Sequence, residues 1–136
     1  MSDITHLYRD AIKQHAADPV GYRQKIRPTH QHEDYNPLCG DRILMQLRIS
    51  HGQVEAAAFD GEACAICVAS ASLLCANIPG KPVSHLSEMH DKLLAALDDK
   101  PDTDGIEALK PLLGVKRYPS RIRCATLPWS TAKKAL

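Results

Sequence analysis

Five cysteines are spread over most of the chain and constrain its fold more than any other feature. They are Cys39, Cys64, Cys67, Cys75 and Cys124. An odd number argues against a closed disulfide framework, and cysteines in a reducing compartment cannot be presumed to form disulfides. We therefore interpret them as metal ligands or reactive thiols, with buried inert thiols as the alternative.

Length and composition indicate one globular domain. The chain of 136 residues is long enough for a single core, so we expect one domain over residues 1–136. Hydrophobic residues make up 44% of it and charged residues 24%, which is ordinary for a globular protein. Apolar stretches stay short and the first residues lack a signal-peptide core, so we expect a soluble cytoplasmic protein without a membrane partner. A formal net charge of +1 gives no indication of nucleic-acid binding.

The order of the expected elements predicts an α+β fold. An N-terminal helix ends at Asp18-Pro19, and a polar, irregular excursion follows over residues 19–38. Hydrophobic patterns predict strands over 42–49, 54–59 and 61–66, and helices over 67–77, 84–97, 105–113 and 120–136. Strands followed by helices predict a small antiparallel sheet of about three strands packed against a layer of helices.

The motif Cys39-Gly40-Asp41 is the first candidate for metal ligands. Ligands at positions i and i+2 of extended backbone point to the same side, and the glycine allows a close turn around a metal. Cys64 follows the hairpin and Cys124 lies near the start of the last helix, so both can reach the same end of the sheet. Three thiolates and one carboxylate suit tetrahedral Zn²⁺ or part of the ligation of an iron–sulfur unit. Spacing alone does not specify this site, because the segments are not paired CxxC motifs.

Four segments together resemble the SufU-type proteins of the superfamily that includes IscU and the NifU N-terminal domain. They are NPLCGD over 36–41, FDGEACAI over 59–66, ASAS over 69–72 and RIRCATLPW over 121–129. The resemblance covers most of the chain and keeps the order of the motifs. It implies the scaffold fold of that superfamily and a metal site made by Cys39, Asp41, Cys64 and Cys124.

The resemblance also implies a function in iron–sulfur cluster biogenesis. It points to a zinc-bound acceptor, sulfurtransferase-like rather than a free-standing enzyme, whose Cys39 takes persulfide sulfur from a SufS-like cysteine desulfurase. Downstream iron–sulfur assembly or recipient proteins are the other expected partners. In IscU proteins a histidine precedes the last cysteine, whereas Arg123 stands here, and the segment from Cys64 to Cys124 is longer; both features favour the SufU branch. The alternative is an IscU-like scaffold that carries a transient [2Fe–2S] cluster.

Other interpretations of the same residues remain open. Cys67 and Cys75 lie in an apolar segment and are expected to be core thiols, with Cys67 a possible extra thiol beside the site. The pair Cys64 and Cys67 also fits a thioredoxin-like CxxC oxidoreductase, but no βαβ pattern surrounds it. A structural zinc module is a third possibility. Arg123 is expected either to offset the charge of the ligands or to be a solvated surface residue.

Polar and charged residues suggest two further features. His30, His32, Glu33 and Asp34 could form a metal site, although we expect a mobile polar loop there. Residues 88–107 hold seven acids against two lysines, whereas residues 108–136 hold seven bases and no acid. The basic segment predicts a docking surface for an acidic partner, with two solvated faces as the alternative.

Overall fold

Three antiparallel strands form one sheet with β2 in the middle. The computed structural model describes residues 2–98 and 104–136, with the side chains of residues 8–98 and 104–136. Its strands are β1 (His30–Asn36), β2 (Asp41–Ser50) and β3 (Gln53–Glu62), in the order β1-β2-β3. Ile43, Met45 and Leu47 of β2 are fully buried, while the residues between them are half-exposed. This period-two alternation gives the sheet one apolar face, which a second layer must cover.

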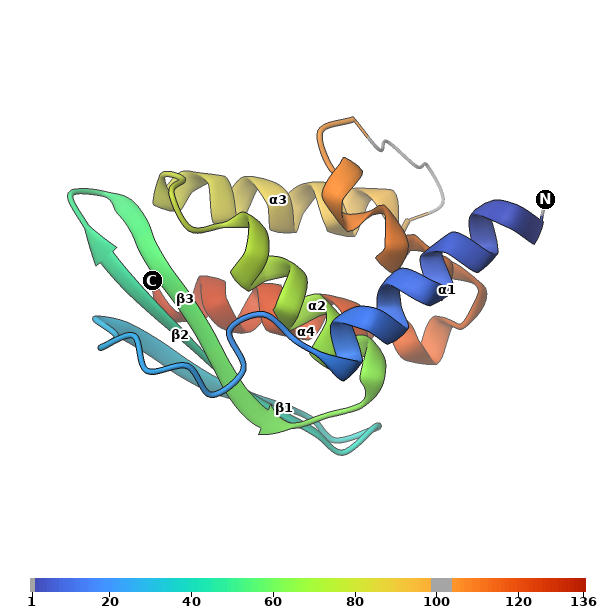
Figure 1. The fold of residues 1–136 in the computed structure, drawn as a ribbon, viewed down its shortest axis with the longest axis horizontal. Coiled ribbons are helices and arrows are strands. Elements are labelled where there is room, and N and C mark those ends of the chain that lie inside the picture. The colour runs from blue at the N-terminus through green and yellow to red at the C-terminus, as the bar shows by residue number, and fades with distance from the viewer. Residues whose placement is uncertain (1, 99–103) are drawn as a thin grey trace.

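Helices supply that second layer, and all of them lie on the same face of the sheet (Figure 1). They are α1 (Ser2–Ala17), α2 (Ala65–Asn77), α3 (Val83–Ala96), the 3-10 helix η1 (Glu107–Arg117) and α4 (Pro119–Ala135). The last helix packs directly on β1 and β2, and α2 packs on both α4 and β3. None of the described helices combines the length and the apolar character that crossing a membrane requires.

Small residues let α2 approach its neighbours closely. Ser70 and Ser72 are fully buried in it, and each uses its hydroxyl to link α2 to another segment. Ser70 donates to the carbonyl oxygen of Ala125 in α4 and accepts a hydrogen bond of 3.0 Å from the indole nitrogen of Trp129. Ser72 lies 2.7 Å from Nδ1 of His15 in α1. The buried hydroxyls thus fix α4 and α1 against α2, and the contact with Ala125 is next to Cys124 in the chain.

The predicted α+β class and three-strand sheet are confirmed, but one strand was predicted in the wrong place. The sheet takes its third strand from His30–Asn36, inside the segment expected to be irregular. Residues 61–66 form no separate strand, because β3 continues to Glu62 and α2 begins at Ala65. The sequence of β1 is almost wholly polar, so it has no hydrophobic alternation to detect; pairing with β2 makes it a strand.

Candidate metal centre

The loop between β1 and β2 places Cys39 at the end of the sheet. Asn36 is buried, and its carbonyl oxygen accepts hydrogen bonds from the amides of Cys39 (3.2 Å) and Gly40 (2.9 Å). Its side chain accepts another from the amide of Leu38 at 3.3 Å. Gly40 has φ +71°, a left-handed conformation that glycine adopts without strain. The tight turn leaves Cys39 half-exposed and directs Asp41, the first residue of β2, inward.

Asp41 joins the hairpin to the start of α2. Its side chain is only 1% exposed, and Oδ1 accepts a hydrogen bond of 2.8 Å from the backbone amide of Cys64. Cys64 is the N-cap of α2, so the carboxylate lies at the helix end that favours negative charge. The Sγ atom of Cys64 lies 3.9 Å from Oδ2 of Asp41. One carboxylate therefore holds Cys64 in place while keeping an oxygen directed toward its thiol.

Cys124 approaches the same point from α4. Its Sγ atom lies 3.3 Å from Sγ of Cys39, and the side-chain amide of Asn36 donates to it at 3.8 Å. Cys124 is fully buried, and burial raises the pKa of its thiol. Hydrogen bonds with Cys39, Asp41 and Cys64 raise that pKa further. These contacts bring all four sequence-predicted ligands into one cluster.

The donor set fits a tetrahedral cation. Ligand atoms of Cys39, Asp41 and Cys124 lie within 4.8 Å of one another, and Cys64 adjoins them through its contact with Asp41. In a tetrahedral zinc site with Zn–S bonds of about 2.3 Å, neighbouring sulfurs lie about 3.8 Å apart. The Cys39–Cys124 distance of 3.3 Å lies about 0.5 Å from that value, and the Cys64 sulfur lies 3.9 Å from an oxygen of Asp41. Thiolates with one carboxylate are ligands that Zn²⁺ accepts.

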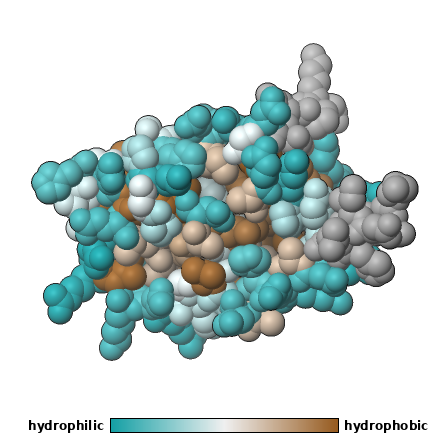
Figure 2. Space-filling view, turned by 45° about the horizontal axis from the view of Figure 1, so that its top comes forward, coloured by the Kyte–Doolittle hydropathy of each residue, from teal (hydrophilic) through white to brown (hydrophobic). Residues whose placement is uncertain are grey.

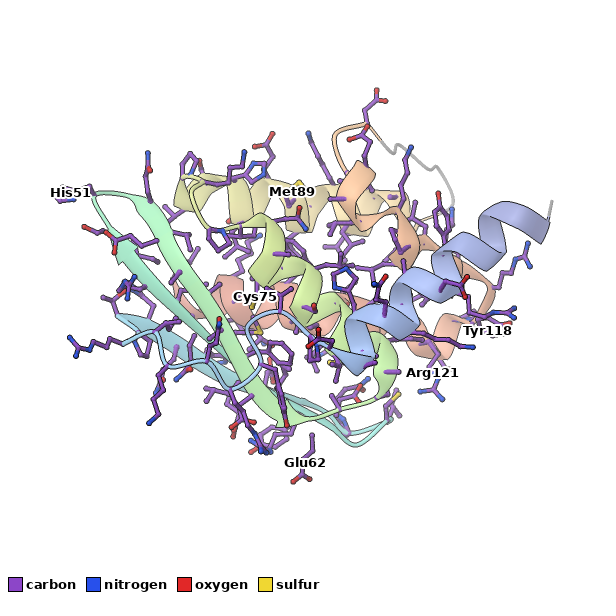
Figure 3. The ribbon with its side chains drawn as sticks, viewed as in Figure 1. His51, Glu62, Cys75, Met89, Tyr118 and Arg121 are labelled. Carbon is purple, nitrogen blue, oxygen red and sulfur yellow. The ribbon has the colours of Figure 1, made fainter. Side chains whose placement is uncertain are left out.

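Arg121 lies beside the thiols, whereas the sequence had singled out Arg123, either to offset the ligand charge or as a solvated surface residue. A hydrogen bond with Cys124 and the charges of Cys64, Cys124 and Cys39 raise the pKa of Arg121. Residues three apart share one face of a helix, so Arg121 stands over Cys124. Arg123 is exposed and turned about 100° away from Cys124 around the helix axis. Figure 3 shows Arg121 beside the connection from β3 to α2, at the end of the molecule that holds the cluster.

The two remaining cysteines are buried, as expected for core thiols. Cys67 is fully buried, and burial raises the pKa of its thiol, with smaller contributions from Asp41, Cys64 and Cys39. Those contributions indicate that Cys67 lies near the cluster. Cys75 lies farther along α2, where burial alone raises its pKa to about 12 (Figure 3). Thiols with raised pKa values are poor nucleophiles, so neither competes with Cys39 for an incoming electrophile.

The polar segment His30–Asp34 is a strand, and its acids already have partners. Glu33 accepts hydrogen bonds of 2.8 Å from Arg42 and from the hydroxyl of Tyr35, and these lower its pKa. Asp34 forms an ion pair of 2.7 Å with Lys134. Among the residues with described side chains, the one group of three or more close metal-ligand atoms is Cys39, Asp41 and Cys124. Neither the mobile loop nor the second metal site that the sequence suggested is present in this strand.

Sequence reasoning missed two contributors to the centre. Asn36 shapes the turn and donates to Cys124, and only its place three residues before Cys39 could have indicated this. Arg121 could have been found from its spacing to Cys124 once a helix was assumed. Chemically, the cluster combines two partly exposed thiols, Cys39 and Cys64, with two buried ligands, Asp41 and Cys124, beside the positive charge of Arg121. Such an arrangement can hold a metal ion and also present Cys39 to another protein.

Comparison with known protein families assigns the chain to one of them. The family described as "NifU-like N terminal domain" matches residues 7–135 of the chain. The resemblance seen in the sequence motifs is therefore confirmed at the level of the family.

Individual relatives match over nearly the whole chain. It is 34% identical to the zinc-dependent sulfurtransferase SufU of Bacillus subtilis, over 99% of this chain and 92% of that protein. It is 32% identical to the iron–sulfur cluster assembly scaffold protein IscU of Thermotoga maritima, over 96% and 92% respectively. The crystal structure of a NifU-like N-terminal protein from Brucella abortus superposes with a TM-score of 0.87 at 22% identity, covering 97% of this chain and 93% of that one. That structure establishes the fold alone.

Proposed function

The chain belongs to the family of the NifU-like N-terminal domain, and from this membership we propose that it is a sulfur acceptor in iron–sulfur cluster biogenesis. In this proposal a cysteine desulfurase supplies the sulfur as a persulfide, and Cys39 receives it. Two relatives, a zinc-dependent sulfurtransferase and a cluster-assembly scaffold, support the pathway. The first of these relatives favours the acceptor over the scaffold.

One observation carries the proposal. Cys39 is partly exposed, as Cys64 is, in a cluster whose other two ligands, Asp41 and Cys124, are buried. It lies in a turn between two strands, where a large partner can reach it, and its sulfur is 3.3 Å from that of Cys124. A purely structural metal site has no need of an accessible ligand. This exposure is what an acceptor thiol requires.

The cluster also explains how its thiols can stay deprotonated, which is the state in which a thiol reacts. We assign Cys39, Asp41, Cys64 and Cys124 as the residues that would hold Zn²⁺. When bound, the cation supplies positive charge that keeps its thiol ligands deprotonated near neutral pH. Arg121 adds a second positive charge beside Cys124 and Cys39. Buried Asp41 accepts a hydrogen bond from the backbone amide of Cys64 at the start of α2. This bond fixes the position of Cys64 without a contribution from water.

The proposed transfer is a thiol–persulfide exchange. The Cys39 thiolate attacks the outer sulfur of the donor's R–S–SH group, forming a new S–S bond. The donor's own S–S bond breaks, and its cysteine leaves as a thiolate. The proton stays on the transferred sulfur, so the products are Cys39–S–SH and R–S⁻. No electron source is needed, because one S–S bond replaces another.

The experiment is a desulfurase turnover assay without iron. Added protein should raise the rate of alanine formation by a SufS-type cysteine desulfurase, because removal of the persulfide frees the enzyme for its next cycle. Cys39→Ala should abolish this stimulation, and mass spectrometry should find extra sulfur on Cys39 of the unsubstituted protein. Cys75→Ala is the matched control, since it removes a thiol outside the cluster. Full stimulation by Cys39→Ala, or stimulation that needs iron and a cluster spectrum, would favour the scaffold instead.

A further inference from the structure

Two sets of basic residues on the helix layer have different surroundings. Lys133 and Lys134, near the end of α4, form ion pairs with Asp91 (3.5 Å) and Asp34 (2.7 Å). At the other end of the helix layer, Arg9, Lys13 and Arg117 form no ion pair with a carboxylate of the described residues. The charge of the first group is locally compensated, and that of the second is available to a partner.

The three unpaired bases surround one groove. It has a volume of about 270 Å³ and lies between α1, the end of η1 and the start of α2. Ile12, Ile66 and Val115 contribute to its apolar lining, and Arg9, Lys13 and Arg117 are exposed residues at its edge. Among the residues whose side chains the structure describes, none that lines it is acidic. An apolar floor with an all-positive edge is complementary to a hydrophobic side chain flanked by carboxylates.

The groove adjoins the metal centre through two short connections. Ile66 follows Cys64 by two residues in the first turn of α2. Tyr118, another lining residue, is 61% exposed and precedes Ser120 by two residues. The carbonyl oxygen of Ser120 lies 3.8 Å from Sγ of Cys39. In Figure 3, Tyr118 and Arg121 extend from neighbouring positions at this end of the molecule.

Figure 2 shows one face of the molecule. Hydrophilic residues dominate the edge of that face, and hydrophobic residues gather as small areas in its middle. A second hollow, lined by Arg23, Lys25 and Arg27, lies over the opposite side of the sheet, and Asp60 pairs with Arg23 there at 3.0 Å. That hollow includes an acid and lies away from the thiols, so it lacks both properties of the first.

We propose that the groove between α1 and η1 is the docking site for an acidic segment of the sulfur-donating protein, with one apolar side chain inserted between Arg9, Lys13 and Arg117. This inference rests on the proposed function, because it names where the donor binds. The sequence predicted a basic docking surface over residues 108–136. The proposed docking site keeps only Arg117 from the bases of that surface and adds Arg9 and Lys13 of α1. A segment bound there lies next to Cys39, so docking brings the donor's persulfide to the acceptor thiol.

The test compares two double charge reversals that change the net charge equally. Lys13→Glu with Arg117→Glu alters the groove, and Lys133→Glu with Lys134→Glu is the matched control. Binding to a SufS-type cysteine desulfurase is measured by calorimetry at about 50 mM and about 300 mM NaCl, because salt screens exposed charges. The groove variant should bind at least about tenfold more weakly at low salt, with a smaller salt dependence, and the control should stay within about twofold of the unsubstituted protein. Zinc content and melting temperature verify that each variant folds.

Several outcomes would overturn the docking site. Unchanged binding by the groove variant would do so, as would equal weakening by both variants, which would indicate a general effect of net charge. A short DNA duplex serves as a competitor: if it binds the groove while the desulfurase does not, the groove serves nucleic acid instead.

The turnover assay separates this inference from the proposed function. Excess desulfurase should restore persulfide transfer to the groove variant, because Cys39 is intact. Cys39→Ala should bind normally and accept no sulfur. Normal sulfur transfer together with unchanged binding by the groove variant would contradict the docking site alone. If the desulfurase neither binds the unsubstituted protein nor transfers sulfur to it, both proposals are contradicted.

Discussion

The sulfur atoms of Cys39 and Cys124 lie 3.3 Å apart although the two residues are 85 positions apart in the chain. Cys39 belongs to the turn between β1 and β2, and Cys124 belongs to α4, which packs on those same strands. The buried side chain of Asn36 reaches from that turn to Cys124. The distance between the thiols is therefore set by helix–sheet packing, and a change in that packing would alter the centre.

Asp41 should prove to have two separable roles, one in metal binding and one in the fold. Asp41→Asn keeps an oxygen that can accept from the Cys64 amide, so the metal-free protein should stay folded, whereas zinc affinity should fall by about tenfold or more because the charge is lost. Asp41→Ala also removes the acceptor and should lower the free energy of unfolding by about 1–3 kcal/mol. Chelator competition and urea unfolding measure the two effects. Equal stability of the two variants would contradict the structural role.

Cys67 should prove dispensable for metal binding. Cys67→Ser keeps the size of a thiol that is buried near the cluster, so zinc content should match that of the unsubstituted protein. Cys64→Ser should lose zinc under the same conditions, because it removes an assigned ligand. X-ray absorption should find three sulfur ligands and one oxygen. Four sulfurs, or zinc loss from Cys67→Ser, would mean that Cys67 replaces one of the assigned residues.

The hydroxyl of Ser70 should contribute measurably to stability. Ser70→Ala leaves the indole N–H of Trp129 buried without its partner, which should lower the free energy of unfolding by about 1–3 kcal/mol. Ser84→Ala, at an exposed position of α3, should change it by less than about 0.5 kcal/mol. Urea titrations provide both values. If Ser70→Ala is as stable as Ser84→Ala, the buried network does not hold α4 in place.

His90 should make stability depend on pH. Burial lowers the pKa of His90, Lys133 lowers it further, and Asp91 partly opposes this; among the described residues its Nδ1 atom has no hydrogen-bond partner. The unfolded chain, with an ordinary histidine pKa of about 6.5, then binds more protons than the folded chain. Stability should therefore fall as pH drops below about 6.5, and the loss should end below the lowered folded pKa.

The measurement for His90 is a comparison with His90→Leu. Unfolding of both proteins is followed by urea titration between about pH 7 and pH 5, the range in which histidine changes charge. The free energy of the unsubstituted protein should decline relative to the variant as the pH falls. Acid also protonates the metal ligands, but that loss is common to both proteins and cancels in the difference. Parallel pH profiles would show that His90 is not held neutral.

The architecture and the candidate ligands could be predicted from the sequence better than the strand β1, the arginine beside the thiols and the groove could. Ile43, Met45 and Leu47 alternate clearly, so β2 could be predicted from the pattern of the chain alone. No such pattern marks His30–Asn36, whose strand depends on pairing with residues distant in the chain. Arg123 was singled out because it stands where IscU proteins have a histidine before the last cysteine, and Arg121 was not predicted. In a helix the residue three positions before Cys124 shares its face, whereas the adjacent residue is turned about 100° away. The groove combines α1, α2 and η1, and no local pattern reports how such elements meet.

Because the centre combines ligands from the first hairpin, the start of α2 and the last helix, it is completed only late in synthesis. At about 5–20 residues per second, the ribosome adds the 85 positions between Cys39 and Cys124 in roughly 4–17 s. During that interval the nascent hairpin carries Cys39 and Asp41 without the sulfur of Cys124. A truncated chain that ends before α4 never acquires the complete ligand set. Only chains whose translation has passed Cys124 can therefore bind a metal ion with the complete ligand set.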